Sequence, residues 1–308
     1  MIKKTNVLVL VLSLLLCACG SPIEQEELID KYTNANSQFI TLDGNRVHYR
    51  DEGQGDVIVL IHGTASSLHT WDDWVEPLSK QFRVIRMDLP GFSLTGPDHK
   101  NRYEVEDDVA FLNKFLSRLK LGKVHLVGSS LGGRIAWQYS LSHPEQVNTL
   151  TLMNALGYPQ ESWPPAIEMA QWPLMDSIMT NFSPRFLYAS GLKEVYANED
   201  QVTEEVIDRY FELSRYPGNL DAFPRRVKAV LDKYSDDISK VSVPTLILWG
   251  EEDIYFPVKN AFKFNKDIRG SKIYTYPNVG HLPMEEIPAE SLSDYLEFLQ
   301  FNTNRRML

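Results

Sequence analysis

Apolar positions follow two different rhythms along this chain, and the two rhythms divide it into strands and helices. Short continuous apolar runs predict strands that are buried on both faces. Stretches with apolar residues at every third or fourth position predict helices with one face on a core. The predicted strands are residues 39–42, 46–50, 57–61, 82–87, 124–127, 147–153, 245–249 and 273–276, and the clearest helices are residues 104–119, 130–142 and 289–299.

Strand and helix patterns alternate from residue 37 onward, which predicts an α/β fold with a mainly parallel sheet and helices on both faces. Asp43-Gly44-Asn45 joins the first two strands and indicates a hairpin. The alternation stops in residues 157–235, where aromatic residues are frequent and prolines break short helices. We therefore expect a core of residues 37–156 and 236–308 with residues 157–235 inserted as a helical cap. Most cap aromatics should pack within the cap, and a minority should line a pocket.

The N-terminal residues follow another pattern. Lys3 and Lys4 precede the apolar run Val7–Leu16, an order typical of a secretory signal peptide. The run is shorter than the ~20 residues that a membrane-spanning helix requires. It ends in Leu16-Cys17-Ala18-Cys19-Gly20, which resembles a bacterial lipoprotein lipobox with Cys19 as the lipid-modified residue. Cys17 suits that role less well, because the large Leu16 directly precedes it.

These residues predict an exported protein that is lipid-anchored to a bacterial membrane through Cys19. Residues 1–18 would be the signal peptide and residues 19–36 a polar, Glu-rich tether. An ordinary secreted protein and a retained anchor remain as alternatives. The mature chain would keep one cysteine, so its stability would depend on the hydrophobic core and not on an internal disulfide.

Charge removes one class of partner. The chain has 31 Lys and Arg residues against 41 Asp and Glu residues, a net charge of −10, which is opposite in sign to that of a nucleic-acid-binding protein. No His-x-x-x-His pair suggests a metal site. The acidic residues are spread along the chain, as on an ordinary solvated surface.

Residues 128–132, Gly-Ser-Ser-Leu-Gly, carry the strongest chemical signal. They follow a predicted strand and open a predicted helix, which is the context of a nucleophile elbow. A sharp turn there exposes the central serine, Ser130, and the flanking glycines remove side chains that would collide. Ser129 lacks this glycine spacing. We therefore predict that Ser130 is the nucleophile.

A serine nucleophile requires a histidine base and an acid that orients it, and after an elbow the acid precedes the histidine along the chain. Only His143 and His281 follow Ser130. His143 lies at the far end of the helix that Ser130 begins, about 20 Å away at 1.5 Å per residue, so we expect it to cap that helix. His281 follows the last predicted strand and is the expected base. Asp253 is the expected acid, with Glu251 and Glu252 as alternatives, because the equivalent position after the preceding strand is an amide, Asn154.

Two backbone N–H groups should stabilise the oxyanion, and we assign them to Leu131 and Thr64. Leu131 directly follows the nucleophile, and Thr64 lies in the loop after strand 57–61. His62 in the same loop is expected to be structural, because His281 already supplies the base. Residues 88–93, Asp-Leu-Pro-Gly-Phe-Ser, are likewise interpreted as a turn, since Pro-Gly follows a strand there.

Together, His62-Gly63, residues 88–92, residues 128–133, Asp253 and Gly280-His281 resemble the α/β-hydrolase superfamily. The resemblance implies an eight-stranded, mostly parallel sheet, a cap inserted after the sixth strand and no organic cofactor. It also implies a nucleophile, acid and base at Ser130, Asp253 and His281.

The expected activity is hydrolysis of a small-molecule carboxylic ester through an acyl-enzyme. C–C bond hydrolase, thioesterase and lactonase activities share this catalytic set and stay open. A lipid-anchored binding protein without turnover is the alternative from another class.

Overall fold

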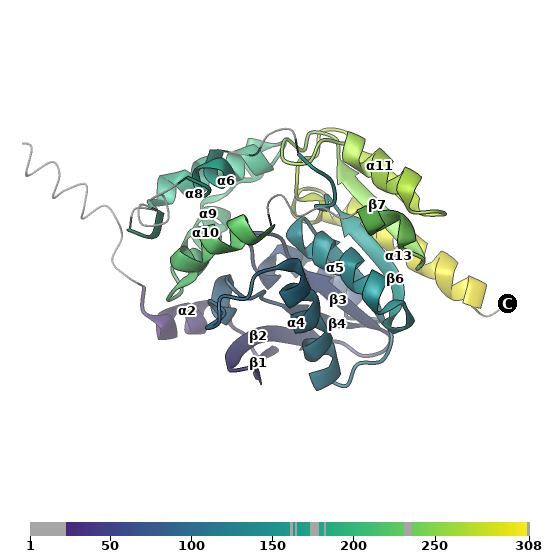
Figure 1. Cartoon of the computed structure of the whole chain (residues 1–308), viewed down its shortest axis with the longest axis horizontal. Helices are drawn as coiled ribbons and strands as arrows, with labels where there is room; N and C mark the ends of the chain where they lie inside the picture. Colours follow the sequence, from purple (N-terminus) through teal and green to yellow (C-terminus); the bar gives the residue numbers. More distant parts are fainter. Residues whose placement is uncertain are drawn as a thin grey trace, which may run out of the picture.

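The sheet follows the order β1-β2-β4-β3-β5-β6-β7-β8 (Figure 1). The computed structural model describes residues 23–160, 163, 165–172, 179–181, 183–230 and 236–306. Strand β2 pairs antiparallel with β1 and β4, and the remaining neighbours pair in parallel. The predicted α/β fold with an eight-stranded, mostly parallel sheet is confirmed. The strands are β1 Ser37–Leu42, β2 Asn45–Glu52, β3 Val57–Ile61, β4 Arg83–Met87, β5 Val124–Ser129, β6 Val147–Met153, β7 Thr245–Gly250 and β8 Lys272–Tyr276.

Helices cover both faces of this sheet. Helices α4 (Val105–Arg118), α5 (Leu131–Ser142) and α11 (Lys259–Asp267) supply apolar side chains to the core on one face. Helices α3 (Asp72–Leu78), α12 (Pro283–Glu286) and α13 (Pro288–Arg306) supply those on the other face. Among the described residues, no helix is long and apolar enough to cross a membrane.

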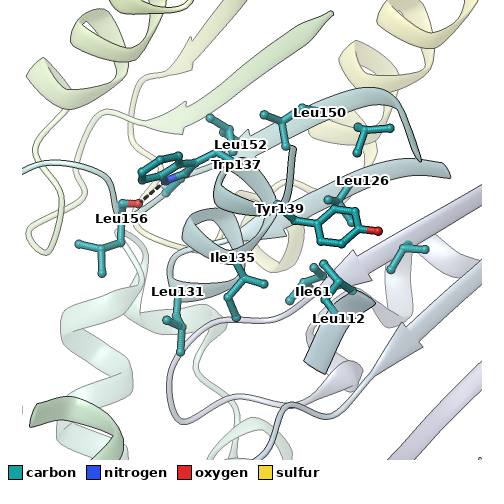
Figure 2. Packing of buried hydrophobic residues seen from close by; sticks show 14 of the residues in the cluster. Ile61, Leu112, Leu126, Leu131, Ile135, Trp137, Tyr139, Leu150, Leu152 and Leu156 are labelled. Carbon is teal, nitrogen blue, oxygen red and sulfur yellow. Dashed lines mark hydrogen bonds between the residues drawn. The ribbon is translucent and has the colours of Figure 1, made fainter. Parts of the chain in front are cut away.

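Helix α5 is fixed in the centre of the first core. Ile135 and Tyr139 lie among Ile61, Leu112 and the side chains of β5 and β6 (Figure 2). The indole N–H of Trp137 donates to the carbonyl oxygen of Leu156 at 3.0 Å, which joins α5 to the loop after β6. Close packing of this kind holds the N-terminus of α5, and hence the preceding residue Ser130, at the carboxyl edge of the parallel strands.

The segment between β6 and β7 forms a helical cap. Its described helices are α6 (Pro165–Met169), α8 (Arg185–Val195), α9 (Glu204–Ser214) and α10 (Asn219–Val230). Polar contacts join the cap to the core: Arg226 of α10 pairs with Asp108 of α4 at 2.6 Å, and Arg134 of α5 donates to the carbonyl oxygen of Val230 at 2.6 Å. Both members of the Arg226–Asp108 pair are buried.

We expect Arg226→Met to lower the free energy of unfolding by about 3–5 kcal/mol at pH 7, because it leaves the Asp108 carboxylate buried without its partner. Burial raises the pKa of Asp108 to about 6 even though Arg226 opposes the shift. The folded state therefore binds protons more tightly than the unfolded chain, and stability falls as the pH rises through this range. Removing Arg226 strengthens that dependence, so the loss should be smaller at pH 5. Denaturant unfolding at both pH values measures it.

Arg185→Met is the matched control for this prediction. Arg185 lies on cap helix α8 and also forms an ion pair with a carboxylate, that of Asp208. Both of these side chains, however, are partly exposed to solvent. Exposed pairs contribute at most about 1 kcal/mol. An equal loss of stability for Arg226→Met at pH 5 and pH 7 would contradict the role assigned to Asp108.

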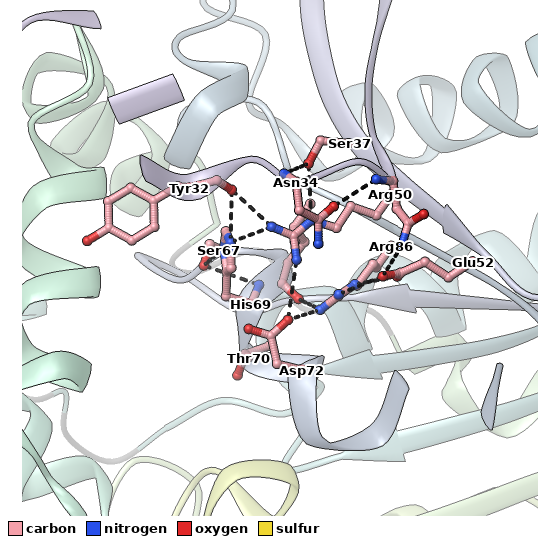
Figure 3. A network of polar contacts seen from close by, with 12 residues as sticks. Tyr32, Asn34, Ser37, Arg50, Glu52, Ser67, His69, Thr70, Asp72 and Arg86 are labelled. Atoms are coloured by element: carbon pink, nitrogen blue, oxygen red, sulfur yellow. Dashed lines mark hydrogen bonds and ion pairs between the residues drawn. The ribbon is translucent and has the colours of Figure 1, made fainter. Parts of the chain in front are cut away.

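The prediction of a polar tether over residues 19–36 is wrong for residues 25–32. These form helix α2 (Gln25–Tyr32), whose Leu28 is buried against Leu213 and Tyr216 near the end of α9. The C-terminal end of the helix is also held, since the Tyr32 carbonyl oxygen accepts from Arg50 at 3.0 Å (Figure 3). The Glu-rich composition of this segment concealed its two buried positions, Leu28 and Tyr32, whose side chains pack the helix onto the domain. The signal peptide, residues 1–18, and Cys19 lie outside the described residues.

Candidate active site

Ser130 lies at a strained turn between β5 and α5. Its φ and ψ are 54° and −118°, a conformation that residues with a side chain rarely adopt. The turn is tight enough to exclude side chains at both flanking glycines. A Cβ on Gly128 would lie 2.2 Å from the Gly132 carbonyl oxygen, and one on Gly132 would lie 2.3 Å from the Ile61 carbonyl oxygen. The glycine spacing that singled out Ser130 in the sequence therefore has a steric cause.

His281 and Asp253 are directly hydrogen-bonded. His281 Nδ1 lies 2.7 Å from Asp253 Oδ2, and both side chains are buried. His281 follows β8 and Asp253 follows β7, so two adjacent strands deliver the pair to the same edge of the sheet. The alternatives Glu251 and Glu252 are exposed to solvent. The geometry thus selects Asp253 as the partner of His281.

Asp253 is itself fixed by three further donors. Asn154 Nδ2 donates to Oδ2 at 2.6 Å, and the backbone N–H groups of Tyr255 and Phe256 donate to Oδ1 at 2.8 and 3.0 Å. The side-chain oxygen of Asn154 in turn accepts from the Gly250 N–H at 3.2 Å. The amide therefore orients the carboxylate of the neighbouring strand. The sequence analysis used Asn154 only to exclude an acid at that position. Its place directly after β6 was the signal that could have predicted its hydrogen bond to Asp253 after β7.

The loop that carries His281 is attached to the cap. The His281 N–H donates to the carbonyl oxygen of Val195 at the end of α8, at 2.8 Å. Glu286 accepts from the N–H of Gly280 at 2.9 Å and from the N–H of Ala197 at 2.8 Å. Burial raises the pKa of Glu286, although these N–H donors oppose the shift. Sequence reasoning missed Glu286, because nothing in its local pattern distinguishes it from a surface glutamate.

Ser130 and His281 line one cavity of about 300 Å³ beneath the cap. Its wall is mainly apolar and includes cap aromatics, as expected from the sequence. Among the described residues that line it, none is Lys, Arg, Asp or Glu. The aromatic side chains in the wall are Phe92, Trp163, Tyr188, Tyr210, Phe223, Tyr255 and Phe256.

The two residues expected to supply oxyanion donors also line this cavity. Leu131 is the first residue of α5, where backbone N–H groups have no carbonyl partner within the helix. Thr64 follows Gly63, whose Cα lies so close to Ser130 that an added Cβ would be 2.9 Å from the Ser130 Cβ. The structure thus brings the backbone at residues 64 and 131 to the same serine.

His62 and Asp88 hold loops of the core in place through buried hydrogen bonds. His62 Nε2 accepts from the Leu89 N–H at 2.9 Å, so its Nδ1 carries the proton and donates to the Gly63 carbonyl oxygen at 2.7 Å. Burial lowers the pKa of His62 to about 4, which keeps the ring neutral. Asp88 is buried and accepts from the Leu68 N–H at 2.8 Å. Burial alone would raise the pKa of Asp88, but His48 holds it below its usual range.

His143 ends helix α5, as predicted. In the described part of the chain, no group of three or more His, Cys, Asp or Glu residues is arranged to hold a metal ion.

The sheet, the Ser130 turn and the Asp253–His281 pair define the class of protein: the chain has the α/β-hydrolase fold. A family model described as the alpha/beta hydrolase fold matches residues 56–179. A 2-hydroxy-6-oxo-2,4-heptadienoate hydrolase of Pseudomonas putida is 29% identical over 265 residues, 81% of this chain and 92% of the relative. The monoacylglycerol lipase abhd6-B of Xenopus laevis is 26% identical, with 82% of this chain and 79% of the relative covered.

Among solved structures, a serine hydrolase involved in carbazole degradation aligns with a TM-score of 0.75 and 26% identity. The alignment covers 86% of this chain and 98% of that one. The chain is therefore similar in sequence and in fold to α/β-hydrolases.

Proposed function

We propose that this protein hydrolyses uncharged carboxylic esters through an acyl-enzyme on Ser130. His281 takes the Ser130 proton as the hydroxyl oxygen attacks the acyl carbon, and Asp253 stabilises the resulting imidazolium. The N–H groups of Leu131 and Thr64 stabilise the oxyanion. His281 then gives its proton to the leaving alcohol, and a water activated by the same base releases the acid. The observation that carries this proposal is the buried 2.7 Å contact between His281 and Asp253 beside the Ser130 turn.

The cavity supports an uncharged substrate. A carboxylate that is buried without a cation is strongly disfavoured, and no Lys or Arg occurs among the described residues of the cavity wall. An acyl chain, in contrast, would contact mainly apolar atoms there. An ester whose charged groups remain outside the cavity therefore suits this site.

C–C bond hydrolysis is the second candidate function, because two of the similar relatives are named as hydrolases of a dienoate and a dienoic acid. Those names describe carboxylates. The absence of Lys and Arg from the described cavity wall favours the ester over such a substrate. Thioesters and lactones lack this charge, and the same catalytic set could attack them.

A substrate panel with a covalent label tests the proposal. We expect p-nitrophenyl esters to be turned over with kcat/KM at least about a hundredfold above that for a 2-hydroxy-6-oxo-dienoate, the ratio that about 3 kcal/mol of unpaired-charge cost produces. A fluorophosphonate should label Ser130. The reverse preference would establish the C–C hydrolase. A folded protein that is neither labelled nor active would support the non-catalytic alternative.

We also propose that the chain is exported and attached to a membrane through lipid on Cys19. The basic residues Lys3 and Lys4, the apolar run Val7–Leu16 and the small residues around Cys19 support this. Mass spectrometry of the membrane fraction should find the mature chain beginning at Cys19 with added acyl mass. An N-terminus at another residue would contradict lipidation at Cys19.

A further inference from the structure

Apolar side chains are exposed on the cap beside the mouth of the cavity. Leu187 of α8 lines the cavity yet is 49% exposed, so it marks where the cavity opens. The preceding residue, Phe186, is 62% exposed. Helix α6 contributes Ile167 to the cavity wall, and shortly after it Met169 and Trp172 are 37% and 57% exposed. We refer to Met169, Trp172 and Phe186 as the cap face.

The N-terminal helix reaches the same end of the cap. Gln25 at the start of α2 donates to the Tyr216 hydroxyl at 2.8 Å. Next to Tyr216, Arg215 donates to the carbonyl oxygen of Ser183 at 2.5 Å, and Ser183 is three residues before Phe186. The chain that precedes α2 therefore starts on the side of the domain where the cap lies.

This arrangement limits how far the proposed anchor can be from the cap. Cys19 precedes Gln25 by six residues, which span at most about 20 Å when fully extended. Lipid on Cys19 would thus hold the cap, and not the opposite side of the core, close to the bilayer.

We propose that the cap face docks onto a lipid surface and that the acyl chain of a membrane lipid enters the cavity directly from it. The inference rests on the proposed ester hydrolysis at Ser130 and names its substrate class. The charges of two basic residues in this region are already balanced by carboxylates of α9. Arg185 pairs with Asp208, and Lys31 pairs with Glu212. Attraction to anionic headgroups is therefore not the driving force, and docking depends on burial of the apolar side chains.

Tryptophan fluorescence can report this docking without any turnover. Of the six tryptophans, Trp71, Trp74, Trp137 and Trp249 are fully buried in the core, whereas Trp172 is exposed on the cap face. The sixth, Trp163, lines the cavity and would be quenched by an entering acyl chain, so it is replaced by Phe in every protein of this experiment. Phosphatidylcholine vesicles with brominated acyl chains should quench the emission of the full-length Ser130→Ala/Trp163→Phe protein. Trp172→Phe should remove most of that quenching, and 0.5 M salt, which screens charges beyond about 5 Å, should leave it unchanged.

A protein that binds the vesicles while Trp172 stays unquenched would overturn the proposal, since the anchor alone would then account for binding. Quenching that disappears in salt would also overturn it. Self-association that protects Trp172 from the lipid, detected by light scattering, would identify a second copy of the chain as the occupant of the cap face.

Matched variants then connect docking to turnover. Phe186→Ser and Trp172→Ser together should lower hydrolysis of a vesicle-embedded ester at least about tenfold, while leaving a soluble short-chain ester within about twofold. Phe262→Ser is the control, because Phe262 is similarly exposed, at 54%, but lies on core helix α11. Equal losses for the cap and core variants would contradict a role for the cap face. Absence of activity on the soluble ester with intact quenching would instead reject the proposed hydrolysis and retain the lipid contact.

Discussion

The Ser130→Ala variant is expected to lose ester turnover by roughly four to six orders of magnitude in kcat, the range typical of a nucleophile knockout. The hydroxyl is the only part of Ser130 that the substitution removes, and the attack on the acyl carbon requires it. Alanine and serine are equally strained by the φ of 54° at position 130, so the turn should persist in the variant. Steady-state kinetics on a p-nitrophenyl ester measure the loss.

Ser129→Ala provides a control at the neighbouring position. Ser129 is the last residue of β5, and its buried hydroxyl has no hydrogen-bond partner among the described residues. Removing it should cost little stability, and turnover should stay within about tenfold of wild type. If Ser129→Ala lost as much activity as Ser130→Ala, or if Ser130→Ala stayed within tenfold, the assignment of the nucleophile would be wrong.

The sheet was predictable because its central strands are apolar on both faces. Residues 58–61 and 246–249 are all apolar and are buried by helices from both sides, so each of them carries the same signal. Ser130 was predictable for a related reason: the steric demands of the turn restrict the residues at Gly128 and Gly132. Local constraints of this kind can be inferred from the sequence alone.

Contacts between distant segments could not be predicted in this way. Helix α2 folds because Leu28 and Tyr32 find apolar partners near residue 213, far along the chain. The hydrogen bond from Asn154 to Asp253 became evident only when the sheet order placed β6 beside β7. In each case the identity of the partner depends on topology, which the local hydrophobic pattern does not encode.

The cap and the proposed catalytic base are parts of one hydrogen-bonded unit. The end of α8 accepts from the His281 N–H, and Glu286 joins Gly280 to Ala197. Leu187, near the start of the same helix, lies at the cavity mouth. Helix α8 therefore contacts the cavity mouth through Leu187 and the proposed base His281 through the Val195 carbonyl oxygen. One rigid element thus connects the place where substrate enters with the residue that transfers the proton.

Replacement of Asp253 by Asn is expected to lower kcat about 10⁴-fold, because the amide can donate to His281 Nδ1 and so place the imidazole in the wrong tautomer. Asp253 accepts hydrogen bonds from His281 and Asn154 on one oxygen and from two backbone N–H groups on the other. The Asn154 amide cannot replace the missing charge. Kinetics across the pH range measure the loss.

Glu251→Gln and Glu252→Gln are the matched controls, since each removes one carboxylate close to Asp253 in the chain. Both side chains are exposed, and Glu251 accepts from Thr275 at the surface at 2.7 Å. Solvent screens their charges, so each variant should keep kcat within about threefold. A loss at either glutamate that exceeds the loss at Asp253 would move the acid to that residue. Equal small losses at all three would show that His281 acts as a base without a carboxylate partner.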